Sequence, residues 1–559
     1  MTSTPQTSAP WWKNPPLLGL LALALCLRLV GYGESVWFDE LFTSKLRIGD
    51  PILLAKTLAN DIHPPLYFVF IYAWNAVFGD GEIWLRLPAL IAGLASIVVL
   101  FRLAENWTDR RVAWVAAGMM ALSPVHIWYS QEGRPYSLNL LLMLVTLLAF
   151  QKLMGGEATR RWRWTYALCL FGVVFTHYYM ATFLFVLPVL ARFARSTEFK
   201  RIAITSGVLL FLLAVYIVPK AYFSSVPTGS QHLRAFTLPE AWKLLFNWFW
   251  LGNTLTPKGG TPLFGTFLPI ALQLAGALAF LRGAYVLLTR FAKGNAWQVL
   301  LLLVTLPAFL FLLPLLGRDA TYIERSALPS LPFFLIVMAT GFASFRNAIP
   351  MRRGVAIGGL IGVFALASYF AQRDEWTIYK PNPGWREATA YIKQHKGPGV
   401  ERLYTEYMTP SALTYYETTF REAKVLAGND DKIERAISRL EGMLGTEGLG
   451  GAITGFARGL IEDFQKKSEE YRRNMTLEIH GTDYQDPLNL PEGVEPAPEF
   501  WGLRLRHEPQ PDPKKTMQRL IDDPSLEVID HQKFRVMEVF RFRRVASEES
   551  TRRSVASEE

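Results

Sequence analysis

Residues 17–42, LLGLLALALCLRLVGYGESVWFDELF, join a long apolar run to an acidic pair. A helix needs about 20 mostly apolar residues to cross a hydrocarbon core of about 30 Å, and the opening run approaches that length. Asp39 and Glu40 follow just past its end, where a carboxylate costs far less than at the bilayer centre. Trp37 and Phe38 favour the membrane surface. The stretch therefore predicts a spanning helix followed by an acidic pair, functional or merely solvated, at one surface.

The composition fits a chain that is partly embedded in a membrane. Of its 559 residues, 51% are hydrophobic and only 19% are charged, which is too apolar for an average soluble enzyme. Several stretches before residue 372 are long and apolar enough to span, and none after it is. Cys26 and Cys169, the two cysteines, lie inside apolar stretches. A disulfide framework or a thiolate metal site is therefore not expected.

The net charge of +10 would suit nucleic-acid binding in a soluble protein. Here the basic residues gather between apolar runs, as the positive-inside rule expects, so we interpret the charge as membrane topology and expect no nucleic-acid partner. Lys13 and five basic loops are assigned to the cytoplasm. These loops are 101–111, 152–163, 192–201, 281–293 and 345–354.

Crossing out and back between these loops predicts about eleven spans. They lie near 17–32, 86–103, 112–129, 136–152, 164–177, 178–191, 202–219, 263–281, 297–316, 327–344 and 354–371. An odd number puts residues 1–16 in the cytoplasm and the C-terminus outside a cytoplasmic (inner) membrane. No small-residue cleavage site precedes Trp37, so we expect the first span to be retained. The apolar stretch 63–79 is left over, either as a helix on the outer surface or as the kinked start of a span.

Residues 372–543 differ in character and predict a small α/β domain outside the membrane. Strand-like runs occur at 402–407, 475–481 and 535–542, and helix-like runs at 384–395 and 430–444. The final residues, 544–559, repeat a short charged sequence and are expected to be disordered. The predicted fold class is mostly α and polytopic, with a transmembrane domain at 17–371 and a C-terminal extracytoplasmic α/β domain.

The outer loop at 33–85 also carries Asp61 and His63, within the stretch NDIHPPLYF at 60–68. With a distant acid these two side chains offer ligands for a divalent cation, although Asp-x-His alone is a weak metal pattern. Equally, they cap a helix that begins at the prolines. His177, in another outer turn, is more often a structural histidine than a catalyst. A divalent cation is left open, and no other cofactor is indicated.

Charged side chains at the outer ends of other spans indicate a site for an anion. Glu132 and Arg134 lie in a very short outer turn, on the side that should be poor in basic residues. Arg86 and Arg325 stand at comparable positions, and arginine suits phosphate because its planar fork donates two parallel hydrogen bonds. The alternative is an ion pair of Arg134 with Glu132 or Asp39 that only holds loops together.

These motifs together resemble a known family. The similarity is to the N-terminal half of bacterial family 39 glycosyltransferases of the GT-C superfamily, with an RgtA-like membrane domain. Their relatives include protein O-mannosyltransferases and the lipid A aminoarabinose transferase. The motifs are WFDE at 37–40, HPPLYF at 63–68, LRLPALIAG at 85–93 and ALSPVHIWYSQEGRPYSL at 121–138. Beyond residue 195 the similarity is thinner, although 324–334 and 382–392 also resemble family segments.

The resemblance implies an enzyme that transfers a sugar from a polyprenyl-phosphate donor to an acceptor hydroxyl on the extracytoplasmic face, with inversion. It places the general base at Asp39, with Glu40 orienting it or pairing with an arginine. It also makes three arginines, Arg86, Arg134 and Arg325, candidates to meet the leaving phosphate. The implied acceptor is an envelope glycan such as lipopolysaccharide, a lipid or a protein.

Two departures from the family pattern leave details open, and two other classes of protein remain. The protein mannosyltransferases have a lysine soon after their His-Pro-Pro, whereas this chain has Tyr67 and Phe68 there, which weakens the case for a protein acceptor. Glu132 stands where some relatives have an aspartate. A transporter or lipid flippase also fits many spans, but predicts mid-span charges and internal repeats. The other alternative is a non-catalytic protein of envelope assembly.

Overall fold

The structure is a computed structural model, and its described residues form two compact units. They are 13–44, 58, 63–79, 81–223, 234–252, 267–291, 295–314, 322–344, 383–405, 409–417, 419–422, isolated positions between 451 and 470, 473–481, 487–488, 490, 495–505, 516–534 and 537–545. The membrane unit comprises Met1–Glu34 and Phe42–Arg373. The α/β unit comprises Ser35–Leu41 and Asp374–Glu559. Asp61, the predicted span at 354–371, the predicted helix at 430–444 and the predicted tail beyond residue 545 lie outside the described residues.

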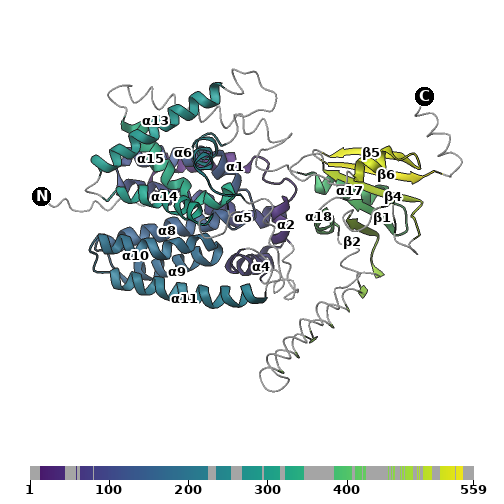
Figure 1. Cartoon of the computed structure of the whole chain (residues 1–559), viewed down its shortest axis with the longest axis horizontal. Helices are drawn as coiled ribbons and strands as arrows, with labels where there is room; N and C mark the ends of the chain where they lie inside the picture. Colours follow the sequence, from purple (N-terminus) through teal and green to yellow (C-terminus); the bar gives the residue numbers. More distant parts are fainter. Residues whose placement is uncertain are drawn as a thin grey trace. The chain divides into compact units, whose positions relative to one another are not determined.

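The membrane unit is built of helices (Figure 1). In chain order they are α1 (Pro15–Leu29), α4 (Leu66–Phe78), α5 (Glu82–Trp107), α6 (Arg110–Leu122), α7 (Pro124–Tyr129), α8 (Tyr136–Met154), α9 (Arg160–Thr176), η2 (Tyr178–Thr182), α10 (Phe183–Phe193), α11 (Phe199–Phe223), α12 (Leu238–Trp242), η4 (Lys243–Phe249), α13 (Leu268–Thr289), α14 (Trp297–Leu312), η8 (Glu324–Ser330) and α15 (Leu331–Ser344). The helix α2 (Phe38–Ser44) begins in the α/β unit and ends in the membrane unit.

Several of these helices are long and apolar enough to cross a membrane. Within the described residues there are five such segments, namely Glu82–Trp107, Tyr136–Met154, Phe199–Val218, Leu268–Thr289 and Glu324–Ser344. Shorter apolar helices occupy Pro15–Leu29, Leu66–Phe78, Tyr178–Phe193 and Trp297–Leu312. The chain is therefore a multi-pass membrane protein. The total of eleven spans stays a prediction.

Two local sequence signals shape the helices next to the candidate site. The segment predicted as one span at 112–129 is two helices, because Pro124 opens α7 and Ser123 Oγ accepts the backbone N–H of His126 at 3.4 Å. The apolar stretch at 63–79 forms α4, which begins directly after Pro65. A proline before the first turn costs the helix no hydrogen bond, since those N–H groups have no partner within the helix.

Close approach of two helices fixes one part of the membrane unit. A Cβ added to Gly283 in α13 would lie 1.9 Å from the carbonyl oxygen of Val337, and one added to Gly341 in α15 would lie 1.9 Å from that of Ala279. The two glycines therefore let the backbones of α13 and α15 touch. Small residues at such crossings are the usual means of packing helices in a membrane, where apolar burial gives little preference for protein over lipid.

The α/β unit contains a six-stranded sheet of order β2-β3-β1-β4-β6-β5. The strands are β1 (Glu401–Thr405), β2 (Phe420–Glu422), β3 (Leu477–Gly481), β4 (Glu499–Leu505), β5 (Leu526–Phe534) and β6 (Met537–Arg544). β1 pairs in parallel with β3 and β4, and β2 with β3, whereas β6 is antiparallel to both β4 and β5. The helices are α17 (Trp385–His395), α18 (Thr409–Tyr416) and α22 (Thr516–Asp522). The sheet confirms that this region has α/β character.

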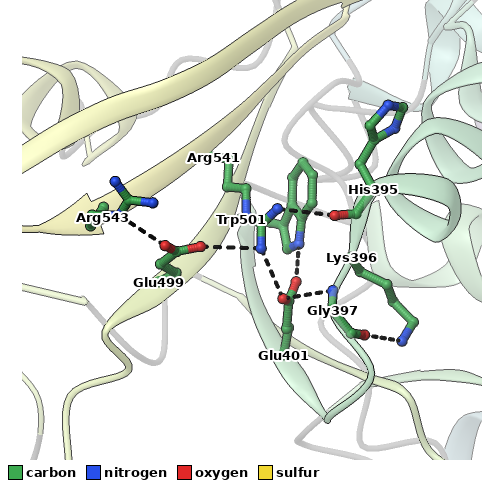
Figure 2. Close-up of polar contacts among 8 residues, drawn as sticks. All are labelled: His395, Lys396, Gly397, Glu401, Glu499, Trp501, Arg541 and Arg543. Atoms are coloured by element: carbon green, nitrogen blue, oxygen red, sulfur yellow. Dashed lines mark hydrogen bonds and ion pairs between the residues drawn. The ribbon is translucent and has the colours of Figure 1, made fainter.

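A charged network ties the end of α17 to the sheet (Figure 2). Glu401 accepts hydrogen bonds from the Gly397 backbone N–H at 2.9 Å, from Trp501 Nε1 at 2.5 Å and from Arg541 Nη2 at 3.1 Å. Arg541 also pairs with Glu499 at 3.1 Å and donates to the carbonyl oxygen of His395 at 2.9 Å. Since each of these charges has an opposite charge or a dipole against it, we interpret the network as structural.

Candidate active site

Arg86, in the first turn of α5, holds the chain where it leaves α1. Its side chain is buried, and Nη1 donates to the carbonyl oxygens of Tyr32 and Glu34, both at 2.7 Å. The Tyr32 hydroxyl donates in turn to the carbonyl oxygen of Ile83 at 3.0 Å. The first loop therefore departs from a fixed point on α5, and Arg86 is the residue that fixes it.

The turn between α7 and α8 carries Glu132 and Arg134, and both side chains are buried. Arg134 Nη1 donates to Thr43 Oγ1 at 3.3 Å, and its guanidinium lies 6.0 Å from the ring centroid of Phe68. The turn packs closely on α5, because a Cβ on Gly133 would lie 2.7 Å from Leu85 Cγ. A buried arginine in this turn is thus held by a hydroxyl and an aromatic face.

A second buried arginine supports the start of α7. Arg28, in the last turn of α1, is fully buried, and its Nη1 donates to the carbonyl oxygens of Ala24 at 2.9 Å and Ala121 at 3.1 Å. Nη2 lies 2.6 Å from His126 Nδ1. Because a guanidinium has no acceptor, Nδ1 of His126 must accept, and its proton is on the other ring nitrogen. Gln131 completes the attachment by donating to the Arg28 carbonyl oxygen at 2.6 Å.

Two histidines and two tyrosines from distant segments come together in the membrane unit. The ring centroid of His63, just before α4, lies 5.9 Å from that of His177 and 6.3 Å from that of Tyr136. Tyr136, at the start of α8, lies 5.0 Å from Tyr129 at the end of α7. The tyrosines flank the turn that carries Glu132. The rings of these two histidines and two tyrosines therefore lie close together, although they come from distant segments of the chain.

Charges of two further residues act on this group. The positive charge of Arg325, in η8, acts on both His177 and Tyr129. The charge of Glu132 also acts on Tyr129. We define the polar cluster as His63, Tyr129, Glu132, Tyr136, His177 and Arg325. It unites three predicted site residues, His63, Glu132 and Arg325, with the weaker candidate His177.

The two tyrosines of the polar cluster were not singled out from the sequence. Tyr129 and Tyr136 flank the turn sequence SQEGRP, and two aromatic residues around a charged turn between spans were the available signal. Arg134 contacts Phe68 of α4 and Thr43 of α2, whereas Arg86 binds the backbone after α1. The arginines proposed to meet the leaving phosphate therefore have different local roles.

The acidic pair lies at the beginning of α2, in the α/β unit. Glu40 is fully buried, and its Oε2 accepts the backbone N–H of Trp37 at 2.7 Å. This is the return half of a capping box, in which a glutamate at the third helical position satisfies the N-cap N–H. Asp39 is the second helical residue, and its side chain is partly exposed. The pair therefore divides into a capping carboxylate and a more accessible one.

A metal centre would need several ligating side chains close together. Across the residues that it describes, no group of three His, Cys, Asp or Glu side chains is placed to hold a metal ion. The rings of His177 and Tyr136 lie near the imidazole of His63. The predicted partner Asp61 lies outside the described residues, so the divalent cation stays a prediction.

The fold and the polar cluster define a multi-pass helical membrane protein that carries an α/β unit. Residues 62–223 match the family model described as dolichyl-phosphate-mannose-protein mannosyltransferase. Over this segment the match confirms the resemblance that the motifs indicated. It encloses every member of the polar cluster except Arg325, and it also encloses Arg86 and Arg134.

Comparison with solved structures finds similar chains at low identity. ArnT from Cupriavidus metallidurans bound to undecaprenyl phosphate shares 16% identity at a TM-score of 0.48, over 95% of this chain and 98% of that chain. The oligosaccharyltransferase of Archaeoglobus fulgidus in the apo form shares 14% identity at a TM-score of 0.42, over 73% of this chain and 64% of that chain. No curated protein sequence matches the chain.

Proposed function

We propose that the protein is a membrane glycosyltransferase that moves a sugar from a polyprenyl-phosphate donor to an acceptor hydroxyl. The observation that carries the proposal is the family match over residues 62–223, which encloses every member of the polar cluster except Arg325. Buried ionisable side chains in a membrane protein are costly and mark functional sites by default. A permeation path would instead be expected to place charges along the middle of the spans.

The first chemical step is removal of the acceptor's proton, and we assign it to Asp39. The hydroxyl oxygen must lose its proton as it attacks the anomeric carbon, and a positioned carboxylate accepts it. Glu40 is occupied as the cap of α2, whereas Asp39 is partly exposed. Attack opposite the phosphate forms the new glycosidic bond as the bond to the phosphate oxygen breaks, which inverts the anomeric centre. The donor leaves as polyprenyl phosphate.

The leaving phosphate gains negative charge, and cations must stabilise it. Arg325 is the strongest candidate, because its side chain is partly exposed and its charge acts on two members of the polar cluster. Arg134 is a second candidate. Arg86 already donates to two backbone carbonyl oxygens, so we assign it to holding the first loop. Glu132 and His63 are assigned to orienting donor groups within the cluster.

The proposed reaction takes place on the extracytoplasmic face of an inner membrane, with envelope glycan, lipid or protein as the acceptor. The topology is tested by cysteine labelling in a variant that lacks Cys26 and Cys169. An impermeant thiol reagent should label a cysteine at Ala59 and should not label one at Asn106 in intact cells. The opposite pattern would overturn the topology.

The function is tested by mass spectrometry of envelope glycans from cells with and without the protein. We expect one glycan to lose a single sugar in the deletion strain, and Asp39→Asn to leave the same defect while Asp109→Asn restores the sugar. Asp109 caps α6 by accepting the N–H groups of Arg111 and Val112, a role that asparagine can retain. Restoration by Asp39→Asn would contradict the assigned base, and unchanged glycans in the deletion strain would contradict the function.

A further inference from the structure

The segment that carries the proposed base is attached to the C-terminal α/β unit. Residues Ser35–Leu41 belong to that unit, although more than 300 residues of the chain lie between them and the rest of the unit, which begins at Asp374. The backbone N–H of Val36 donates to the Tyr416 hydroxyl at 2.7 Å. Ser35 Oγ accepts the backbone N–H of Arg386 at 3.3 Å and donates to Glu387 Oε2 at 3.4 Å. Three hydrogen bonds thus fix the entry to α2.

Burial shows that the attachment is packed as well as hydrogen-bonded. Ser35 is 4% exposed, Val36 is 0% exposed and Leu41 is 3% exposed. A buried Val36 N–H must have an acceptor, because an unsatisfied buried donor costs about 1–3 kcal/mol. The Tyr416 hydroxyl is that acceptor.

The groups that hold the segment are themselves held. Arg386 and Glu387 lie in the first turn of α17, where Trp385 is 1% exposed. Tyr416 ends α18, and the next residue, Glu417, pairs with Lys393 of α17. Glu417 also accepts the backbone N–H and the hydroxyl of Thr419, both at 3.0 Å. The α17–α18 pair therefore offers the first loop a preorganised surface rather than a mobile one.

Asp39 lies between two fixed points. On one side, Val36 is bonded to Tyr416, and on the other, Glu40 is bonded back to the Trp37 N–H across Asp39. A side chain on a backbone fixed at both ends loses little freedom when it must point at a reacting proton. The proposed base is thus a partly exposed group in an otherwise fixed stretch of chain.

We propose that the α/β unit is part of the catalytic apparatus, because α17 and α18 position Asp39 through Tyr416 and Ser35. This inference rests on the proposed function, in which Asp39 is the general base. Tyr416 and Ser35 are positioning residues, since they act through Asp39: Tyr416 accepts the backbone N–H of Val36, and Ser35 bonds the first turn of α17 at Arg386 and Glu387. Geometry errors near 1 Å at a catalytic group lower rates by up to about 100-fold.

The test compares Tyr416→Phe with Tyr391→Phe in the purified full-length protein. Tyr391→Phe also removes a hydroxyl hydrogen bond in the α/β unit, the one that Tyr391 donates to Asp530 of β5. Sugar transfer is followed from membranes preloaded with radiolabelled lipid-linked sugar, and donor-site binding is followed with undecaprenyl phosphate. We expect Tyr416→Phe to lower kcat by about 10-fold while undecaprenyl phosphate affinity stays unchanged. Its melting temperature should fall somewhat below that of the control, because the Val36 N–H loses its acceptor.

A second pair of variants keeps the test decisive if Tyr416→Phe unfolds. Ser35→Ala removes both hydrogen bonds of the serine hydroxyl, whereas Ser35→Thr retains the hydroxyl, so the threonine variant should recover most of the transfer rate. Equal rates for Tyr416→Phe and Tyr391→Phe, with Asp39→Asn inactive, would overturn the positioning role alone. Full activity of Asp39→Asn would instead overturn the assigned base, and the positioning role with it.

Discussion

Arg28 and Arg541 are both held by several acceptors, but the acceptors differ in kind. Arg28 is fully buried in the membrane unit and binds backbone carbonyl oxygens and a neutral ring nitrogen of His126. Arg541, in the α/β unit, keeps 22% of its side chain exposed and pairs with the carboxylates of Glu401 and Glu499. The membrane unit therefore holds this cation on dipoles, whereas the α/β unit holds its cation on two carboxylates as well as on the carbonyl oxygen of His395.

The difference follows from the surroundings of each arginine. A carboxylate buried beside Arg28 would have to be desolvated as well, and that penalty often exceeds the gain from pairing. Carbonyl oxygens at the end of α6 need donors in any case, because the last turn of a helix leaves them without partners in the helix. Arg28 meets that need for Ala121 at 3.1 Å. We therefore expect a large loss of stability when a cation that binds backbone carbonyl oxygens is replaced. The loss should be smaller when the replaced charge belongs to a network of ion pairs.

Arg28→Met should give the largest loss of stability. It leaves the carbonyl oxygen of Ala121 and the ring of His126 without their donor, and each unsatisfied buried acceptor costs about 1–3 kcal/mol, so a total of about 3 kcal/mol is expected. Thermal unfolding of the purified protein in detergent measures it. Arg102→Met is the control, since Arg102 forms a partly exposed pair with Glu105 three residues away. Similar melting temperatures for the two variants would contradict the expectation that the buried Arg28 contributes more to stability than the partly exposed Arg102.

Glu401→Gln should have an intermediate effect. The glutamine places an NH₂ group against donors that are now bound by the two carboxylate oxygens of Glu401. The free energy of unfolding is therefore expected to fall by about 1–2 kcal/mol. Hydrogen exchange at the Gly397 amide, which donates to Glu401, should become faster. Asp522→Asn serves as the control, because Asp522 is an exposed carboxylate in the same unit that accepts from Gln518. Unchanged protection of the Gly397 amide would show that the network is dispensable.

The ion pair of Glu198 with Arg163 tests by pH whether opposite charges and dipoles stabilise an arginine differently. Its expected effect on stability is the smallest of the three. Hydrogen bonds from Arg163 at 2.8 Å and 3.0 Å hold the pKa of Glu198 below its usual range. A lowered pKa means that this stabilisation is present above the unfolded value of about 4.3 and is lost as the pH falls through the lower folded value. The melting difference between wild type and Glu198→Gln should therefore disappear in acid. A melting difference that does not shrink as the pH falls below the unfolded value would contradict the assignment, and Arg28→Met should show no such acid loss.

The sequence predicted most of the local structure but few of the long-range partners. Its period-2 runs marked β1, β3 and β6, and the run at 384–395 marked α17, because these signals lie within one segment. β2, a strand of three residues, and β4 and β5 were missed. Gly502 in β4 and the register shift between Val528 and Asp530 in β5 break the simple alternation that marks a strand.

At the candidate site, the sequence indicated which residues to expect but not which other side chains they would contact. His63, Glu132 and Arg325 were expected near one membrane face, and the fold gathers them in the polar cluster. Nothing local to Arg28 indicated that its partner would be His126, 98 residues away. The resemblance separated Asp39 from Glu40, but it did not indicate that Glu40 caps α2, because that bond depends on where the helix begins.

Asp39→Asn is the most direct test of the account, because the change keeps the size of the side chain and removes its ability to accept a proton. Transfer from radiolabelled lipid-linked sugar by the purified variant should fall by about 100-fold or more. Undecaprenyl phosphate binding and melting temperature should stay at the level of Asp109→Asn. Transfer at the wild-type rate by Asp39→Asn would contradict the assignment of Asp39 as the general base.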